Sequence, residues 1–491
     1  MKIIFINPPA WNFTGQTNAN CPVLGVMYLA TILDKAGYQA KVIDAEALGW
    51  SWDKLAQEIK QENPDVIGLT STTLFMPVLY KTADVCRETL PQVKILAGGF
   101  GPSLEPEKTL KECPSIDILG LGESEITIIE LIRCLEANGD LSKINGLAFR
   151  NQSGDVIKTA PRPLIEDLDS LPLPDYRLIN PPFSFYHGVF GVYKGIALPN
   201  AVMVGSRGCP HRCIFCCNAG KKPRFRSAKS IADEIEFYKK ELKVKSIQFY
   251  DDEFVGMSSG QNAWVREVCQ EIIDRGLDDL GYLCQGRCSR FLDLETLKMM
   301  RRAGFRWIWW GVESGSQKIL DRIKKDLKID DIYYSFKLAK KAGLLSLMFM
   351  MVGFPDETKE DVKKSADLIK GIKPDKIRIH ITTPLPGSEL WEELYQKGQI
   401  DEFDYFKYST RLSVVHHTDT MTREEIKEYY RMLIFRFENG YWYFFKFVLK
   451  SLTTIEGWKQ FSKRLKIAVN HLFKWRKMKK SEAHEKNNHH N

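Results

Sequence analysis

The sequence predicts an α/β protein with two parallel sheets: a doubly wound sheet in the N-terminal part, and a partial six-stranded barrel after it. In both parts, short apolar segments rich in β-branched residues alternate with amphipathic helical segments, which is typical of parallel sheets covered by helices. The 491 residues are 44% hydrophobic and 27% charged, as in ordinary globular domains. We expect units at 1–140, 198–420 and 421–478, a linker at 141–197 and a disordered tail at 479–491.

Five strands are expected in the first 140 residues, at 2–7, 39–46, 65–72, 93–99 and 116–122. The helical patterns between them include one that ends at Gly37 and one that follows Ser51, a typical N-cap residue. Ligands of doubly wound sheets bind at the carboxyl ends of the strands. That edge should carry the glycine-containing loops at 98–103 and 120–125, where a ligand can approach the backbone closely.

The linker is rich in Pro, Asp and Asn and should contain a small hairpin around "NQSG", residues 151–154. A second alternation of strands and helices begins near residue 198. Six strand–helix units predict a partial barrel of the TIM type, with its chemistry at the carboxyl ends of the strands. The six strands are expected at 201–206, 246–252, 281–287, 307–314, 345–354 and 376–383.

The positive charge is concentrated near the C-terminus. The net charge is +8, yet residues 441–480 alone hold eleven Lys or Arg and one Glu. The chain therefore has no nucleic-acid groove spread over its surface, and we expect no nucleic-acid partner. The aromatic residues of the segment 441–480 either pack on the barrel or form an interfacial helix pair that binds anionic lipid. No apolar run reaches the ~18 residues of a membrane span, so we expect a cytoplasmic protein whose cysteines stay reduced. Association with a membrane through residues 441–480 is the open alternative.

Three cysteines form the most informative pattern. Cys209, Cys213 and Cys216 follow the first barrel strand with the spacing C-x-x-x-C-x-x-C. A structural zinc site usually takes four ligands in two separated pairs, and ferredoxin runs have other spacings and a further cysteine. Three thiolates favour an iron–sulfur cluster with one iron left open, although zinc remains the alternative. Cys217 adjoins Cys216 and should point elsewhere.

"CPHRCIFC" (209–216), with Phe215 before its last cysteine, resembles the cluster loop of radical S-adenosylmethionine enzymes. Four more segments resemble that superfamily in order: "FYDDEF" (249–254), "GVESGS" (311–316), "VGFPDET" (352–358) and "TTPLPGSELW" (382–391). The resemblance implies a 4Fe–4S cluster and bound S-adenosylmethionine. It implies that Asp251, Asp252 or Glu253 faces the methionine ammonium of S-adenosylmethionine and that Arg287 faces the methionine carboxylate. It also implies that Glu313 and Ser314 lie near the ribose and that Gly353 lies beside the adenine. Without the resemblance, these segments would be read as helix caps and turns.

The N-terminal part resembles the cobalamin-binding domain found in many of these enzymes, through Pro8–Pro9, "GLTSTT" (68–73), "GG-x-x-P" (98–102) and "GLGESE" (120–125). The motif D-x-H-x-x-G is missing, so the resemblance implies cobalamin without a histidine ligand. Relatives often have His where this chain has Gly101. The alternative is a Rossmann-like domain without a ligand. The implied contacts are Thr70, Ser71, Thr72, Gly98, Gly99, Gly122 and Glu123.

Together the resemblances imply a radical enzyme that removes hydrogen from an unactivated carbon, while its cofactors carry the chemistry. We expect C-methylation of an apolar, lipid-like or tetrapyrrole substrate, or of a natural product, with a flavodoxin or ferredoxin as reductant. One alternative is an oxidoreductase or cyclase resembling the anaerobic magnesium-protoporphyrin ester cyclases. The other is a corrinoid carrier or sensor without catalysis.

Overall fold

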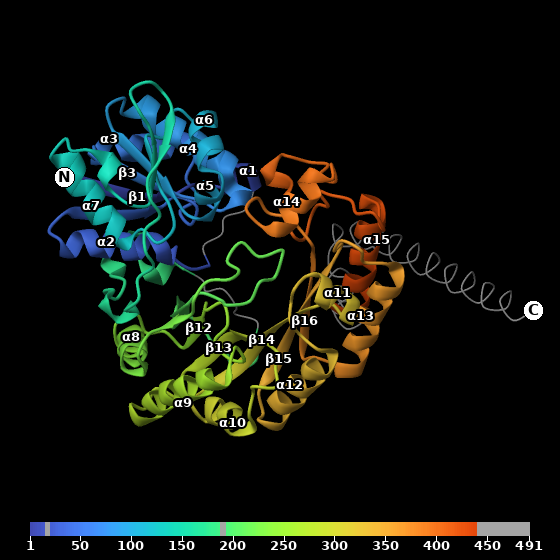
Figure 1. Cartoon of the computed structure of the whole chain (residues 1–491). Coiled ribbons are helices and arrows are strands. Elements are labelled where there is room, and N and C mark those ends of the chain that lie inside the picture. The colour runs from blue at the N-terminus through green and yellow to red at the C-terminus, as the bar shows by residue number, and fades with distance from the viewer. Residues whose placement is uncertain (15–19, 187–192, 439–491) are drawn as a thin grey trace, which may run out of the picture.

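The computed structural model describes residues 1–14, 20–186 and 193–438. Two sheets organise it, one in the N-terminal unit (blue to teal) and one in the core that follows (green to orange; Figure 1). The basic aromatic segment 441–480 and the tail 479–491 lie outside the described residues, so the expectations about them stay predictions. In the described part, no helix has the length and apolar character needed to cross a membrane.

The N-terminal sheet confirms the doubly wound fold. Strands β1 to β5 are parallel in the spatial order β5-β4-β3-β1-β2. Ile3 and Phe5 pack on one face with α2 and α7, whereas Ile4 and Ile6 pack on the other with α3 and α4, as period-2 alternation requires. The bounds are β1 Lys2–Asn7, β2 Gln39–Asp44, β3 Val66–Thr70, β4 Lys94–Gly98, β5 Ile118–Gly120, α1 Trp11–Thr14, α2 Leu24–Lys35, α3 Trp52–Glu62, α4 Met76–Thr89, α5 Phe100–Leu104, α6 Pro106–Glu112 and α7 Glu125–Glu136.

The segment expected to be a linker completes both edges of this sheet. The hairpin around residues 151–154 consists of β6 (Leu147–Arg150) and β7 (Val156–Lys158), and β6 pairs antiparallel with β5. On the opposite edge, β8 (Ile179–Asn180) pairs parallel with β2. Pairing satisfies the backbone groups that an open edge would leave exposed. The hairpin therefore belongs to the sheet of the N-terminal unit rather than to a separate linker.

The core confirms the partial barrel. Its six strands are all parallel, in the order β16-β15-β14-β13-β12-β9, and helices cover their outer face (Figure 1). The bounds are β9 Asn200–Met203, β12 Ser246–Phe249, β13 Gly281–Gly286, β14 Phe305–Glu313, β15 Leu345–Val352, β16 Lys376–Ile381, α8 Ala228–Lys240, α9 Ser259–Asp274, α10 Leu294–Arg302, α11 Gln317–Arg322, α12 Ile329–Lys341, α13 Lys359–Ile372, α14 Glu389–Gln396 and α15 Arg423–Leu433.

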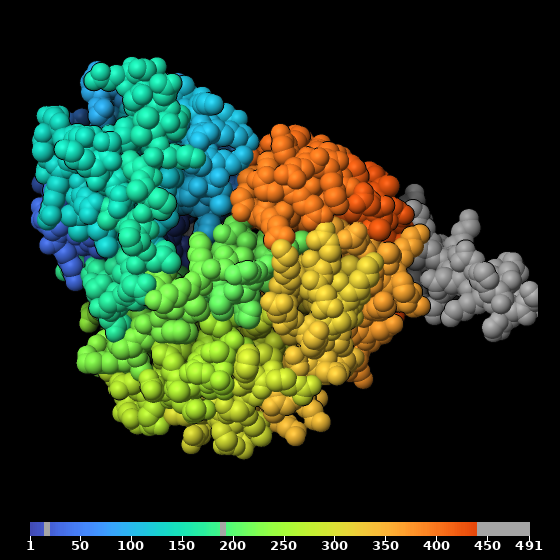
Figure 2. All heavy atoms as spheres, viewed as in Figure 1, coloured from blue at the N-terminus to red at the C-terminus, as the bar shows by residue number. Residues whose placement is uncertain are grey.

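The two units touch at the segment that carries α14 and at a short ribbon of the core. In Figure 2 the orange α14 segment abuts the blue lobe, and Phe406 packs on Phe13 with ring centroids 4.7 Å apart. The ribbon pairs β10 (Ser206–Arg207) antiparallel with β11 (Arg224–Phe225). Since β10 and β11 bracket residues 208–223, the ribbon is the base of the cysteine loop.

Arg226 anchors that base. Its buried guanidinium pairs with Glu234 of α8, which is fully buried, and donates to the Val204 carbonyl oxygen at 3.1 Å. The indole of Trp264 donates to the Arg226 carbonyl oxygen at 2.8 Å. A buried carboxylate is tolerated only when it is paired, so Arg226 ties the ribbon to α8.

We expect Arg226→Met to lower the free energy of unfolding by about 3–5 kcal/mol, because it leaves the Glu234 charge buried without its partner. Lys229→Met is the matched control on α8, since it removes an exposed pair with Asp233, worth about 0–1 kcal/mol. Urea unfolding followed by tryptophan fluorescence measures both. Equal midpoints for the two variants would show that the Arg226 pair does not anchor the ribbon.

Candidate active site

The three cysteines lie in a loop held by its own backbone. Gly220 N–H donates to the His211 carbonyl oxygen at 2.8 Å, and Lys221 N–H donates to that of Cys209 at 2.9 Å, which continues the ribbon into the loop. Gly208 has φ +93°, and a Cβ atom there would lie 2.5 Å from the Lys222 carbonyl oxygen. Only glycine fits this position, so the turn into the first cysteine is defined by the backbone.

The surroundings of the thiols suit a metal cluster. Burial raises the pKa of Cys209 to about 12 and also raises the pKa values of Cys213 and Cys216; bound iron reverses this preference, because a coordinated thiol loses its proton. Within the described residues, no three His, Cys, Asp or Glu side chains converge on one metal ion. In a 4Fe–4S cluster each thiolate binds a different iron, so the ligands need not meet at one point. The donor set of three thiols fits such a cluster.

Cys217 points away from this group. Its Sγ lies 3.7 Å from the Pro386 carbonyl oxygen, in the loop that precedes α14. Cys216 Sγ instead accepts a hydrogen bond from the Asn218 N–H at 3.3 Å. The adjacent thiols thus have separate surroundings, as the sequence predicts.

Buried charges line the strand ends beside the loop. Lys325 Nζ lies 3.2 Å from Glu313 Oε1, and Arg287 Nη1 lies 3.6 Å from Glu253 Oε1. Glu253 Oε2 lies 3.3 Å from His211 Nε2 of the cysteine loop. Arg287 Nη1 is buried and has no hydrogen-bond partner within the described part of the chain. An unsatisfied buried cationic donor is costly, so this position fits an anionic group such as a carboxylate.

Sequence reasoning did not single out Lys325, twelve residues after Glu313. Burial lowers the pKa of this lysine, but the negative groups around it, Glu313 first among them, together outweigh that effect and the pKa is raised. Its ammonium also lies 5.9 Å from the centre of the Phe215 ring. No local motif marks the residue, because its position depends on the turn between α11 and α12.

The three acidic residues after β12 diverge. Asp251 is buried, accepts hydrogen bonds from Gly205 N–H at 3.1 Å and from Ser206 Oγ at 2.5 Å, and so ties β12 to β10. Its pKa is raised to about 6, because burial outweighs those hydrogen bonds. Asp252 is exposed and accepts a hydrogen bond from the Asn218 side chain at 2.6 Å. Of the three, Glu253 alone lies beside Arg287.

The other candidates for S-adenosylmethionine binding also have partners in the protein. Glu313 has φ +68° at the end of β14, and the Oγ of Ser314 accepts a hydrogen bond from Ser316 N–H at 3.2 Å. Gly353 donates its N–H to Glu357 at 2.7 Å, and its carbonyl oxygen lies 2.8 Å from His416 Nε2. Phe215 packs against Phe354 with ring centroids 5.7 Å apart. The Gly353 backbone is therefore held from both sides.

At the edge of the N-terminal sheet, the structure brings most of the cobalamin candidates together. Thr70 ends β3 and is followed by Ser71 and Thr72, and Gly98 ends the neighbouring β4 and is followed by Gly99. Gly99 has φ +93°, and a Cβ atom there would lie 2.6 Å from the Ser71 carbonyl oxygen. A Cβ atom on Gly101 would lie 2.6 Å from the Met76 sulfur, so a larger side chain does not fit there. Gly99 and Gly101 thus let the loop after β4 pack closely on the residues after β3, which brings the expected cobalamin contacts of both loops to one edge of the sheet.

Gly122 and Glu123 follow β5 on the same edge. Gly122 has φ +74° and open space around it. Glu123 accepts hydrogen bonds from Arg224 at 2.9 and 2.7 Å and from Ile165 N–H at 3.0 Å. Its carboxylate is thus bound to the base of the cysteine loop and to the segment before the core, while the expected contact with cobalamin stays a prediction.

The inner face of the barrel is aromatic. Ile308 and Trp310 of β14 pack against the helices, and Trp307 and Trp309 lie on the opposite face. Trp309 and Phe349 have ring centroids 5.9 Å apart, and Phe349 and His380 5.8 Å apart. Phe349 and His380 are partly exposed. Burial lowers the pKa of His380 to about 4, so this ring is neutral near pH 7.

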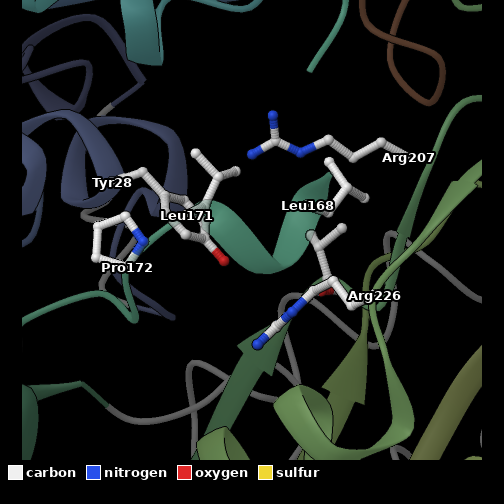
Figure 3. A pocket seen from close by; sticks show the side chains of 7 residues that line it. Tyr28, Leu168, Leu171, Pro172, Arg207 and Arg226 are labelled. Atoms are coloured by element: carbon white, nitrogen blue, oxygen red, sulfur yellow. Dashed lines mark hydrogen bonds between the residues drawn. The ribbon is translucent and has the colours of Figure 1, made fainter. Parts of the chain in front are cut away.

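A further pocket lies between the units, lined by Tyr28, Leu168, Leu171, Pro172, Val204, Arg207 and Arg226 (Figure 3). Its two guanidinium groups are already paired, Arg207 with Glu125 and Arg226 with Glu234. The pocket is therefore part of the junction between the units.

Comparison with known proteins agrees with both halves of this description. Residues 203–369 match the Radical SAM superfamily, and residues 14–132 match the B12 binding domain. An uncharacterized methyltransferase of Pyrococcus horikoshii is 31% identical over 88% of this chain and 91% of its own length. The anaerobic magnesium-protoporphyrin IX monomethyl ester cyclase of Cereibacter sphaeroides is 30% identical over 87% of this chain and 68% of its own length.

Solved structures show the same fold. The radical S-adenosylmethionine methyltransferase TsrM from Kitasatospora setae, with cobalamin and a 4Fe–4S cluster bound, superposes with a TM-score of 0.66 at 17% identity, covering 81% of this chain and 75% of its own. The cobalamin-dependent S-adenosylmethionine radical enzyme OxsB with aqua-cobalamin bound gives a TM-score of 0.65 at 20% identity. The match covers 81% of this chain and 55% of the OxsB chain. The chain therefore belongs to the cobalamin-binding radical S-adenosylmethionine enzymes, whose cofactors are a 4Fe–4S cluster, S-adenosylmethionine and cobalamin.

Proposed function

We propose that this enzyme methylates an unactivated carbon of an apolar substrate. One observation carries the proposal. The loop after β5, at the ligand-binding edge of the cobalamin-binding unit, is ion-paired through Glu123 to Arg224 at the base of the cysteine loop. This pairing supports the proposal because both cofactors would then bind at one junction, as methyl transfer between them and a substrate requires.

Several relatives that are named as methyltransferases support methylation. Besides the Pyrococcus horikoshii protein, they include a cytidylyl-2-hydroxyethylphosphonate methyltransferase of Streptomyces wedmorensis, 24% identical over 87% of this chain. A hopanoid C-3 methylase of Methylococcus capsulatus is 23% identical over 88%. The apolar substrate class is supported by the aromatic inner face of the barrel, where Trp309, Phe349 and His380 would exclude water from the reacting carbon.

In this proposal the protein binds and orients the cofactors. Cys209, Cys213 and Cys216 would hold the cluster. Arg287, whose Nη1 lies 3.6 Å from Glu253 but makes no hydrogen bond within the described part of the chain, would bind the methionine carboxylate. When bound, the cluster supplies the electron that cleaves S-adenosylmethionine, and cobalamin supplies the methyl group. A reductant of the flavodoxin or ferredoxin class would serve this enzyme in the cytoplasm.

A cyclase or oxidoreductase reaction is the second candidate. The Cereibacter sphaeroides cyclase and its Rubrivivax gelatinosus counterpart are 30% and 29% identical to this chain. In that case the substrate would be a tetrapyrrole, which the aromatic inner face would also suit, and cobalamin would not donate a methyl group.

The methyl group of S-adenosylmethionine distinguishes these two functions. We expect the reduced holoenzyme, incubated with a cell extract and S-adenosylmethionine carrying a deuterated methyl group, to form a product containing that label. S-adenosylhomocysteine should accumulate together with 5′-deoxyadenosine. If mass spectrometry finds 5′-deoxyadenosine and a changed metabolite but neither label nor S-adenosylhomocysteine, the cyclase or oxidoreductase reading replaces the methyltransferase.

Cys213→Ala should abolish the brown chromophore of the anaerobically reconstituted protein, because it removes one thiolate of the cluster. Cys217→Ala is the matched control, since its Sγ faces Pro386, and it should keep nearly full iron content. Iron and sulfide analysis checks both. Our ligand assignment is wrong if Cys217→Ala loses the cluster while Cys216→Ala retains it.

Cobalamin should bind without a histidine nitrogen on cobalt, because residues 1–140 contain no histidine. Paramagnetic resonance of the Co(II) state reports the lower ligand. The spectrum should lack nitrogen superhyperfine splitting from a protein imidazole, and such splitting would contradict this assignment.

Replacing Gly99 with Val should reduce corrin retention, because a side chain there meets the Ser71 backbone.

A further inference from the structure

We propose that Glu123 and Glu125, with Arg224 and Arg207, form an interdomain clamp that sets the position of the cobalamin-binding loop relative to the cluster loop. These four are positioning residues: they act on the distance between two cofactors and need not touch either one. The inference rests on the cofactors of the family and does not depend on the identity of the substrate.

The geometry of the clamp is a two-pronged fork. Arg224 Nη1 and Nη2 donate to the two carboxylate oxygens of Glu123 at 2.9 and 2.7 Å. Arg224 also donates to the Ile165 carbonyl oxygen at 2.6 Å, and Ile165 N–H donates back to Glu123 at 3.0 Å. Bidentate pairing of this kind fixes orientation as well as distance.

A second arm lies beside the first. Arg207 Nη2 donates to Glu125 Oε1 at 2.6 Å, and its Nη1 lies 3.5 Å from Glu123 Oε1. Arg207 and Arg224 are direct cross-strand partners in the ribbon. The two strands of the base of the cysteine loop are therefore both bonded to the start of α7 and the residues before it.

Burial gives the clamp its rigidity. Each arm has one buried side chain, since Arg224 is 3% exposed and Glu125 9% exposed, and their partners Glu123 and Arg207 are partly buried at 17% and 21%. Water therefore has limited access to these bonds. Burial alone would raise the pKa of Glu123, but the Arg224 and Ile165 hydrogen bonds and the charge of Arg207 outweigh it and lower the pKa. Glu123 is thus held as a carboxylate, which the fork requires.

Little chain separates the clamp from either cofactor site. Cys209 follows Arg207 after Gly208, whose conformation excludes a side chain. On the other side, Glu123 follows Gly122 at the carboxyl end of β5. A displacement at the clamp would pass directly to both loops. Misplacement of reacting groups by about 1 Å costs reactions on the order of a hundredfold, so a fixed separation matters for transfer between two cofactors.

The experiment measures that separation without a substrate. The full chain is loaded with cluster and hydroxocobalamin and reduced, and pulsed dipolar paramagnetic resonance gives the distance distribution between cluster and Co(II). We expect Arg224→Gln to keep iron and corrin content but to shift the distribution or widen it by about twofold or more, because one site moves relative to the other. Arg224→Lys, which keeps the charge, should fall between this variant and the unchanged chain.

Lys222→Gln is the matched control, since Lys222 lies on the same segment and pairs with Glu166 at the surface; it should leave the distribution unchanged. Glu125→Gln tests the second arm if Arg224→Gln does not fold, and should also widen the distribution. Unchanged distributions in Arg224→Gln and Glu125→Gln would overturn the proposal. Loss of corrin in Glu123→Gln, with Arg224→Gln unaffected, would instead make Glu123 a direct cobalamin contact and equally overturn it.

Discussion

In a parallel sheet, the loops that follow the strands gather at one edge, and this chain contains two such sheets. The pairing of the partly buried Glu123 with the buried Arg224 joins the edge of the first sheet to the base of the cysteine loop in the second unit. A doubly wound domain and a partial barrel could be joined in many orientations. Here the ion pair and the packing of Phe406 on Phe13 hold them in one orientation, in which both ligand-binding edges meet at the same junction.

Buried charge is also what defines the cysteine loop and its surroundings. Lys325 is matched by Glu313, and Arg287 lies beside Glu253, so positive and negative groups are paired at the strand ends. Buried charges persist only with partners, and Arg287 still has an unused donor. At Gly353, by contrast, the backbone groups already have partners within the protein. The N–H donates to Glu357, and the carbonyl oxygen lies beside His416 Nε2. The end of β13 thus keeps a donor for an anion, whereas the backbone after β15, on the far side of β14, is hydrogen-bonded within the protein.

In our proposal, the inner face of the barrel decides which substrate binds. Relatives that share this architecture are named for a tetrapyrrole ester, a hopanoid and a nucleotide-linked phosphonate, so the fold alone does not select among them. On this face of the chain, the partly exposed rings of Phe349 and His380 adjoin Trp309. These side chains lie on adjacent strands, and a change in one ring alters the wall that a substrate meets without disturbing the helix-facing core.

The sequence by itself determined both sheets and the cysteine triplet, because these depend on local patterns: alternation along a strand, and three thiols within eight residues. It did not determine the partners of Glu123, since Arg224 lies 101 residues away, nor the place of Lys325 beside Glu313, which depends on a turn after a helix. It assigned Asp251, Asp252 and Glu253 to one role, whereas the fold turns them in three directions. The sequence predicted the hairpin at 147–158, but it did not predict that the first strand of this hairpin pairs with β5 and so extends the sheet. Tertiary structure decided these points because long-range pairing of buried charges and strand edges leaves no periodic trace in the sequence.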